Sequence, residues 1–331
     1  MQKPIVVVGS VNLDLVAGAD RIPQVGETVI GTSFRTFYGG KGANQAVGVA
    51  RLGHPVSIVG NVGDDAFGPQ LRQALEDAGV DVSWLRTVPG SSGVALITTG
   101  RQGENNIVVV PGANGRLTPQ QLEKAKPVIE GAGFLLTQLE IPLETVEYLA
   151  ALAERYRIPL MLDPAPAREL PASILRQVTW ITPNETETQA LLKSSVNPDT
   201  DSEIFRAADQ LLASGARNAL LKLGARGCVI AQAGQAKKHL PAFSVNAIDT
   251  TAAGDAFNAA FAVGLVGGQA AEPSAVFASA AAAISVTRAG AQPSMPTHHE
   301  VTQFLERPAR VDRDPPGTNT EGAPGRRNPL P

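Results

Sequence analysis

The sequence has little of several residues and patterns that large classes of protein require. Its 331 residues include a single cysteine, Cys228, which excludes an internal disulfide and a cysteine-ligated zinc site. This thiol lies in an apolar run, 228–231, a setting that favours a buried structural cysteine over a reactive one. The four histidines show no metal-ligand spacing, and they are His54, His239, His298 and His299.

Neither charge nor hydrophobicity is concentrated in long runs. The chain carries 28 Lys and Arg residues against 31 Asp and Glu residues, a formal net charge of −3, without a basic stripe. A nucleic acid is therefore not expected as a partner, because binding to a phosphate backbone needs clustered positive charge. The Ala-rich stretch 274–286 is too short to span a bilayer and predicts a buried helix, and no signal peptide is recognisable. We therefore expect a cytoplasmic protein with no membrane partner.

Glycine and proline, in contrast, are abundant and unevenly placed. There are 33 glycines and 25 prolines, and the last 24 residues hold six of the prolines and three of the glycines. That segment has few apolar residues and cannot bury enough surface to offset its ordering entropy, so residues 308–331 are predicted to be a disordered tail. The rest of the chain, roughly 307 residues, is near the upper size for one hydrophobic core.

Short apolar runs alternate with amphipathic segments of helical spacing along most of the chain. This order predicts an α/β fold in which a central, mostly parallel sheet has helices on both faces and binds ligands beyond the C-terminal ends of its strands. The expected strands are Ile5–Val8, Val56–Val59, Gly133–Leu136, Leu160–Leu162, Trp180–Ile181 and Ala219–Leu221. The expected helices are Asn44–Leu52, Pro69–Ala78, Leu143–Tyr156 and Ser202–Ser214.

Two segments do not fit this alternation and predict a second, smaller sheet. Residues 27–38 alternate polar and apolar side chains, and the runs 94–99 and 105–110 flank a glycine-containing turn as in a hairpin. A sheet with one apolar face needs a cover. These strands are therefore expected to form a lid over a pocket, a contact with a second subunit, or both.

The strongest chemical signal is the segment Asp249–Phe257, in which two acidic residues bracket small ones before an apolar helix. Small residues let the backbone approach a ligand, and the free N–H groups and dipole of a helix N-terminus favour an anion. Asp255 would then lie beside an anion site and accept the proton of an attacking hydroxyl, as phosphoryl transfer requires. The alternative is that Asp255 only caps the helix or favours its first turn.

Two segments near the N-terminus are further candidates. In Gly39–Ala46 three glycines surround a lysine before a helix, as in a phosphate-cradling loop, although the spacing is not that of a P-loop. The alternative is a tight turn capped by Asn44. The segment that follows the first strand lacks G-x-G-x-x-G, which argues against an NAD-dependent dehydrogenase. Its Asn12 and Asp14 would point the same way and hold two sugar hydroxyls, with an Asx turn as the alternative.

Two weaker candidates follow other apolar strands. Glu140 would lie at the C-terminal end of a strand, and Asn184 and Glu187 would share one face of a helix. Taken alone, such residues are more often helix caps or solvated charges.

Together these motifs resemble the ribokinase family of carbohydrate kinases over residues 6–305. The main signatures are 39–46 and 249–257, and three more stretches, 163–170, 182–187 and 287–294, follow the family pattern. The resemblance implies ATP-dependent phosphorylation of the 5-hydroxyl of D-ribose. It also implies a large α/β domain (1–15, 40–92 and 111–307) with a β-sheet lid (16–39 and 93–110), and lids that pair in a homodimer.

The same resemblance implies a set of site residues. Asp255 is expected to be the general base, and the backbone amides of Ala252, Ala253, Gly254 and Asp255 to form the anion hole for the transferring phosphoryl group. The residues expected to hold the sugar are Asn12, Asp14, Gly40, Lys41, Asn44, Glu140 and Asp255. Those expected to hold or position ATP and Mg²⁺ are Asn184, Glu187, Lys222, Gly224, Gly227, Gly254 and Ser279. Those expected around a monovalent cation, usually K⁺, are Asp249, Thr251, Ser285, Arg288, Gly290 and Ser294.

The sequence departs from the family pattern at two of these motifs and leaves rival functions open. Lys222 and Ala256 stand where threonine is common. Another sugar kinase, for fructose, deoxyribose or a nucleoside, is the first rival, although aromatic residues make up 5% of the chain and add no stacking platform for a base. The second rival is a sugar-binding protein without catalysis, which the presence of Asp255 and its glycine disfavours.

Overall fold

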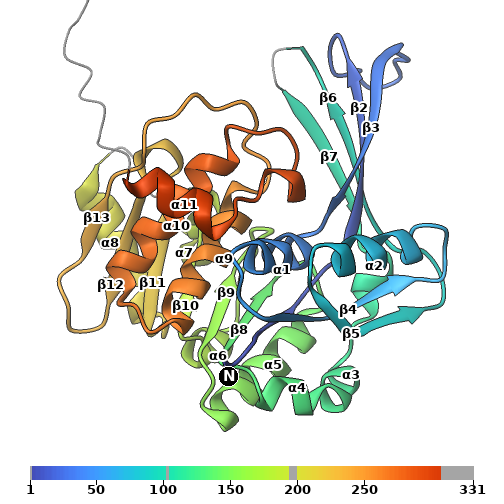
Figure 1. Cartoon of the computed structure of the whole chain (residues 1–331). Helices are drawn as coiled ribbons and strands as arrows, with labels where there is room; N and C mark the ends of the chain where they lie inside the picture. The colour runs from blue at the N-terminus through green and yellow to red at the C-terminus, as the bar shows by residue number, and fades with distance from the viewer. Residues whose placement is uncertain (1, 102–103, 194–199, 307–331) are drawn as a thin grey trace, which may run out of the picture.

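The computed structural model describes residues 2–101, 104–193 and 200–306. These residues form a nine-stranded sheet and a separate four-stranded sheet that rises away from it (Figure 1). The disordered tail expected over 308–331 lies outside the described residues.

The large sheet has the strand order β13-β12-β11-β10-β9-β8-β1-β4-β5. Its strands are β1 (Ile5–Val8), β4 (Val56–Gly63), β5 (Asp81–Val88), β8 (Phe134–Gln138), β9 (Leu160–Asp163), β10 (Trp180–Ile181), β11 (Asn218–Lys222), β12 (Cys228–Gln232) and β13 (Lys238–Leu240). Neighbours from β11 to β5 pair in parallel, whereas β12 and β13 extend one edge with antiparallel pairs. The mostly parallel sheet and the six expected strands are confirmed. The strands of this sheet that were not expected, β5, β12 and β13, lie at or next to its two edges.

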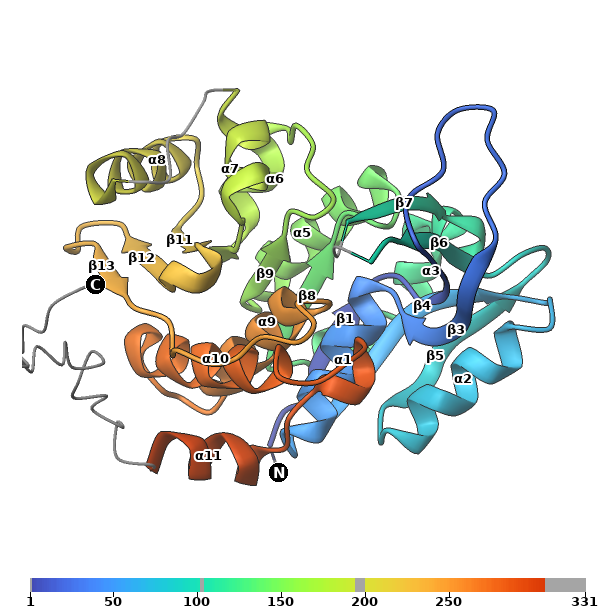
Figure 2. The same ribbon diagram turned by 90° about the horizontal axis from the view of Figure 1, so that it is seen from above.

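Helices cover both faces of the large sheet (Figure 2). The helices are α1 (Lys41–Arg51), α2 (Gly68–Asp77), α3 (Pro119–Lys124), α4 (Lys126–Glu130), α5 (Leu143–Tyr156), α6 (Ala172–Gln177), α7 (Glu185–Leu192), α8 (Asp201–Ala213), α9 (Ala253–Val266), α10 (Ala271–Ser285) and α11 (His298–Glu306), with short 3₁₀ turns η1 (Gly112–Arg116), η2 (Gly224–Arg226) and η3 (Gln292–Ser294). The four helices expected from the sequence are all present, as is the buried Ala-rich helix, α10.

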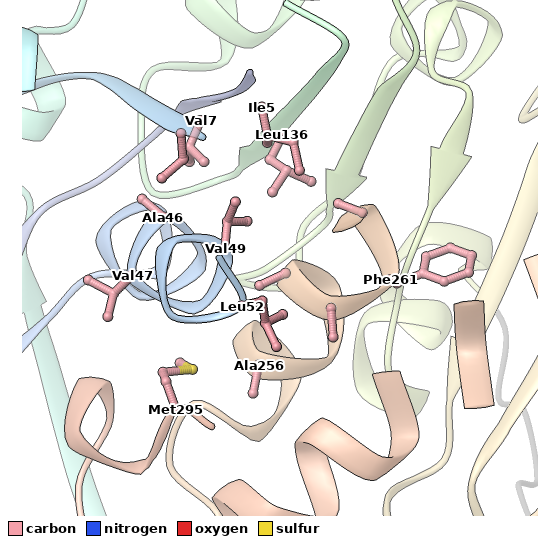
Figure 3. Close-up of a cluster of buried hydrophobic side chains, with 14 of the residues drawn as sticks. Ile5, Val7, Ala46, Val47, Val49, Leu52, Leu136, Ala256, Phe261 and Met295 are labelled. Carbon is pink, nitrogen blue, oxygen red and sulfur yellow. The ribbon is translucent and has the colours of Figure 1, made fainter. Parts of the chain in front are cut away.

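The alternation of side chains along β1 explains why its sequence is apolar without a break. Ile5 and Val7 pack into the core beneath α1, α2, α9, α10 and α11, whereas Val6 and Val8 pack into the core on the opposite face. A strand buried on both faces has no solvated side and therefore no polar alternation. Figure 3 shows the first core, where side chains of β1 meet Val49 of α1.

The four-stranded sheet has the order β3-β2-β6-β7. Its strands are β2 (Asn12–Ala19), β3 (Gly31–Gly39), β6 (Gly93–Thr99) and β7 (Asn105–Val110). The predicted hairpin is confirmed, because β6 and β7 pair antiparallel. Strand β3 begins four residues later than the alternation at residue 27 suggested, and β2 was not recognised as a strand of this sheet. The domain boundaries remain a prediction, although β2 runs unbroken across the expected border at residues 15 and 16.

Parallel pairing brings the C-terminal ends of several strands to one edge of the large sheet. Gln138 ends β8, Asp163 ends β9 and Lys222 ends β11, so three polar side chains meet at this edge. Among the described residues, none of the helices is long and apolar enough to cross a membrane.

Helix α1 lies so close to the segment after β1 that Gly42 has no room for a side chain. A Cβ atom at position 42 would lie 2.6 Å from the backbone N of Ser10 and 2.7 Å from the carbonyl C of Gly9. We expect Gly42→Ala to lower the free energy of unfolding by ~1–3 kcal/mol, because overpacking outweighs the ~0.5–1 kcal/mol that alanine adds within a helix. Guanidinium denaturation measures this change.

Gly131→Ala is the matched control for this prediction. Gly131 has φ −77°, and the nearest atom to a Cβ there would be 3.4 Å away. We expect its free energy of unfolding to stay within ~0.5 kcal/mol of the wild type. A Gly42→Ala protein as stable as Gly131→Ala would contradict the steric argument.

Candidate active site

The carboxylate of Asp255 lies at the start of α9, buried against α1. Its two oxygens accept hydrogen bonds from Asn44 Nδ2 at 3.0 Å and from Gln45 Nε2 at 3.1 Å. The N-cap residue of α9 is Ala252, in the left-handed region at φ 58°. Capping by Asp255 is therefore wrong, since its side chain bonds to α1 instead of the backbone of α9. Asp255 does lie in the first turn of α9, as the other part of the alternative expects.

The surroundings of Asp255 tune its proton affinity toward neutral pH. Burial raises its pKa to about 6, with the positive charge of Lys41 lowering it and the nearby carboxylate of Asp163 raising it further. A base works best when its pKa is close to the pH of the reaction. Asp255 is therefore protonated more readily than an ordinary aspartate, at a pH closer to neutral.

The glycine-rich segment places Lys41 at the first position of α1. Gly40 precedes it with φ 86°, which glycine adopts readily. The Lys41 backbone N–H donates to Glu140 Oε2 at 3.1 Å, and Ser10 Oγ donates to the same oxygen at 2.5 Å. Asn44 lies inside the helix and donates to Asp255, so the predicted alternative of a turn capped by Asn44 is wrong.

The Lys41 ammonium lies among several carboxylates. Burial acts to lower its pKa, but the negative charges of nearby acidic side chains outweigh burial and raise the pKa. Those side chains are Asp255, Asp163, Glu140 and Glu187. Lys41 therefore stays protonated and partly balances the acidic charge at this edge of the sheet.

Asn12 and Asp14 begin β2 and lie on one side of it. They are strand residues, so the Asx-turn alternative is wrong. Asn12 Oδ1 accepts from Asn114 Nδ2 at 2.7 Å. Burial, with the negative charges of Glu140 and Asp255, raises the pKa of Asp14 to about 7. The residues expected to hold the sugar thus surround one acidic, largely buried space.

The structure adds residues to this space that sequence reasoning missed. Gln45, Gln138, Asp163 and Asn114 are all buried and bond to predicted site residues or to one another. Gln45 follows Asn44 in the glycine-rich motif, and Asp163 ends an apolar strand. Position at a strand end is the signal that could have identified Asp163, whereas nothing local marks Asn114.

A cavity of about 430 Å³ opens beside the start of α9. Five of the predicted nucleotide-binding residues line it, namely Lys222, Gly224, Gly227, Gly254 and Ser279. Its remaining wall is largely apolar, with Phe243, Val245, Phe257 and Val286 among the lining residues. A small apolar cavity with a few polar groups is the usual form of a small-molecule site.

Asn184 and Glu187 lie at the N-terminus of α7 and do not line this cavity. Asn184 Oδ1 accepts from the Glu187 backbone N–H at 2.8 Å, and Glu187 Oε2 accepts from the Asn184 backbone N–H at 2.8 Å. This is a capping box, so the capping alternative describes their contacts. Glu187 is nevertheless buried, and burial raises its pKa despite the opposing charge of Lys222.

Asp249 ties together two loops beside α9. Its Oδ1 accepts from the Thr251 backbone N–H at 2.9 Å and its Oδ2 from the Gly290 backbone N–H at 2.8 Å. Burial acts to raise the pKa of Asp249, but these hydrogen bonds prevail and lower it. The Arg288 side chain bonds instead to Glu300, at 2.5 Å. Ser285 and Ser294 are buried, with their hydroxyls donating to nearby carbonyls.

Comparison with known proteins connects this geometry to a family. A model described as the pfkB family of carbohydrate kinases matches residues 2–298. The chain belongs to the pfkB family of carbohydrate kinases. The family resemblance expected from the two glycine-containing signatures is thereby confirmed.

Relatives match this pfkB kinase over nearly its whole length. A ribokinase of Bacillus subtilis is 42% identical over 302 residues, which cover 91% of this chain and 99% of the relative. A deoxyribokinase of Salmonella typhi is 37% identical over 303 residues, which cover 91% of this chain and 98% of the relative. The structure of Arabidopsis thaliana ribokinase complexed with ribose and ATP has a TM-score of 0.87 at 34% identity, with 93% of this chain and 100% of that chain covered.

This likeness confirms the expected ribokinase-like fold of the pfkB kinase, a large α/β unit with a small β-sheet. Among the described residues, no group of three or more His, Cys, Asp and Glu side chains is placed to hold a metal ion.

Proposed function

We propose that this pfkB kinase transfers the γ-phosphoryl group of ATP to the 5-hydroxyl of D-ribose, giving D-ribose 5-phosphate and ADP. The observation that carries the proposal is the position of Asp255, between the acidic space at Asn12 and Asp14 and the cavity beside α9. The ribokinases among its relatives, one of them with ribose and ATP, support this choice of substrates.

The sugar is proposed to bind between β2, α1 and the end of β8. Asn12, Asp14 and Glu140 supply acceptors for hydroxyl groups, and Gly40 and Lys41 lie at the start of α1 beside them. The Asn44 Oδ1 atom is buried and has no hydrogen-bond partner among the described residues. A buried acceptor without a partner costs free energy, so a ligand hydroxyl there would be stabilised.

The phosphoryl group is proposed to pass across the N-terminus of α9. Asp255 accepts the proton of the 5-hydroxyl group. The oxygen of that hydroxyl bonds to the γ-phosphorus while the bond from phosphorus to the ADP oxygen breaks. The amides of Gly254 and Asp255 lie in the first helical turn, where no helix carbonyl reaches them, and would donate to the phosphoryl oxygens. The Ala253 amide already donates to Thr250 O at 3.3 Å and therefore contributes less. The amide of the N-cap residue Ala252 completes the proposed anion hole.

ATP is proposed to occupy the cavity beside α9, with its base against the apolar wall and its phosphates toward Gly254. Lys222, Gly224, Gly227 and Ser279 would line its path. Mg²⁺ fits this arrangement as an ion held mainly by phosphates and water, which is its usual preference. Asn184 and Glu187 would help to position it, since the Glu187 carboxylate is buried close to the charge of Lys222.

A monovalent cation, K⁺, is proposed beside the loops that Asp249 joins. The donors fit a weakly bound, oxygen-preferring ion, because Asp249 offers a carboxylate and the segments at Thr251, Ser285, Arg288, Gly290 and Ser294 offer carbonyls. The two loops approach closely, since the Ile248 backbone N–H donates to Val286 O at 2.7 Å. The ion would stabilise the loop that leads into Asp255 without touching the sugar.

The small sheet is proposed to act as a lid and to pair with a second copy of the chain. Every residue of β7 is exposed, and Val108 and Val110 share one face with Leu96 of β6. Exposed apolar side chains gathered on one sheet commonly mark a contact surface. We place the reaction in the cytoplasm, where ATP is available.

A sugar panel tests the proposed substrate. We expect ATP consumption with ribose, 2-deoxyribose, fructose and adenosine to give the highest kcat/KM for ribose. A site built to bond a hydroxyl rejects a sugar that lacks it, because its own polar groups are left unpaired. The 37% identical deoxyribokinase makes 2-deoxyribose the second candidate. If ribose is not the best substrate by kcat/KM, the assignment is wrong.

Asp255→Asn tests the proposed base. We expect kcat to fall by ~10² or more, since the amide cannot accept the proton, while ribose binding stays within about tenfold because the amide keeps the shape of the carboxylate. Steady-state kinetics and calorimetry measure the two effects. Asp77→Asn, at an exposed position in α2, is the matched control and should match the wild type. Unchanged turnover in Asp255→Asn would remove Asp255 from its role.

Exchange of the cation tests the K⁺ site. We expect activity to fall severalfold when K⁺ is replaced by tetramethylammonium at constant ionic strength, because the organic cation is too large for carbonyl ligands. Asp249→Asn should show a weaker response to the exchange than the wild type. Equal activity of the wild type in both salts would argue against the site.

A further inference from the structure

Gln45 links two buried carboxylates through one amide. Its Nε2 donates to Asp163 Oδ2 at 3.0 Å and to Asp255 Oδ1 at 3.1 Å, and its Oε1 accepts from Gln138 Nε2 at 2.7 Å. The side chain is 1% exposed. Three hydrogen bonds occupy the amide, so it cannot rotate without leaving a buried polar group unpaired.

Asp163 carries this connection to the nucleotide cavity. Its second oxygen, Oδ1, lies 2.9 Å from Lys222 Nζ, in an ion pair whose side chains are 3% and 13% exposed. Lys222 lines the cavity, and its Nζ would lie 3.5 Å from a Cβ placed on Gly254. The ammonium therefore lies at the N-terminus of α9, next to the residue that precedes Asp255.

These contacts form a continuous chain from the cavity to the base, in the order Lys222, Asp163, Gln45, Asp255. Each link is a hydrogen bond or ion pair of 3.1 Å or less between buried or nearly buried side chains. Two like-charged carboxylates stay close only if something holds them, and here a neutral amide donates to both.

We propose that Gln45 and Asp163 are positioning residues for phosphoryl transfer, holding the Asp255 carboxylate and the Lys222 ammonium at a fixed separation on the two sides of the transferred group. The inference rests on the proposed function. Lys222 would contact the phosphates of the nucleotide, and Asp255 would contact the sugar hydroxyl. The hydrogen bonds through Asp163 and Gln45 would then set the distance between the phosphate and the hydroxyl that attacks it. Small errors in such a distance are costly to the rate.

Several charged groups surround Asp255. Lys41, Asp163 and Asp14 act on Asp255 itself. The next charges are Lys222, which pairs with Asp163, and the carboxylates of Glu140 and Glu187, which act on Lys41. A negative neighbour makes the Asp255 carboxylate harder to ionise, and a positive neighbour makes it easier. Removal of Asp163 or of Lys222 should therefore move the acidic limb of the pH–rate profile in opposite directions.

The first test is Gln45→Leu, which keeps the volume of the side chain and removes its hydrogen bonds. We expect kcat to fall about 10- to 100-fold while the KM for ribose changes by less than about threefold, because orientation and not binding is lost. Gln232→Leu is the matched control. Gln232 donates to Asn218 at the opposite end of β11 and β12. Its kcat should equal that of the wild type.

The second test separates a positioning role from a purely structural one. We expect Asp163→Asn to shift the acidic limb of kcat to lower pH and Lys222→Met to shift it to higher pH, with the double variant between them. Loss of structure alone would not move the limb in two directions. Circular dichroism checks that each variant is folded. If Gln45→Leu does not fold, the shifts of the acidic limb in Asp163→Asn and Lys222→Met test the inference without it.

The outcomes distinguish the inference from the proposed function. An inactive wild type in the ribose assay would overturn both. If the wild type is active, two results would overturn the inference alone. One is a kcat of Gln45→Leu within about twofold of the wild type, and the other is a shift of the acidic limb in the same direction in Asp163→Asn and Lys222→Met.

Discussion

The hydrogen bonds from Asn44 and Gln45 to Asp255 join the first turns of α1 and α9, which are more than 200 positions apart in the chain. The same two helices pack together in the core below, where a Cβ on Gly48 would lie 2.7 Å from the Cβ of Ala259. The polar site and the apolar packing therefore depend on one helix contact. A shift of α1 against α9 would leave the buried Asp255 carboxylate without its hydrogen bonds and would also open a cavity between the helices.

An excess of acidic groups surrounds that contact. Among the described residues, the five carboxylates of Asp14, Glu140, Asp163, Glu187 and Asp255 lie near two ammonium groups, Lys41 and Lys222, at the edge where the parallel strands end. Burial together with this repulsion raises the pKa of Asp14 to about 7 and of Asp255 to about 6. Such an arrangement suits ligands that donate hydrogen bonds, as sugar hydroxyls do, and a nucleotide that arrives with a metal ion.

The small sheet begins beside these acidic groups. Strand β2 begins at Asn12, four residues beyond the end of β1, and Asn114 ties this start to the segment after β7. Asn114 accepts from the Val11 backbone N–H and donates to Asn12. A Cβ on Gly93 would lie within 2.2 Å of both asparagine side chains. A ligand at Asn12 would therefore lie at the base of the small sheet, where β2 and β6 begin.

The sequence alone determined the features that depend on neighbours within one turn or one strand. The unbroken apolar run of β1 follows from burial on both faces, the capping box of Asn184 and Glu187 follows from their spacing of three, and the two glycine-containing signatures identify the family. Tertiary structure decided the rest. Gln45, Asp163 and Asn114 matter through partners 118, 210, 59 and 103 positions away. No local pattern encodes such contacts, because they exist only once parallel strands bring their ends to one edge and α1 meets α9. Asp255 became distinguishable from a helix cap for the same reason: its carboxylate is oriented by another helix, not by its own.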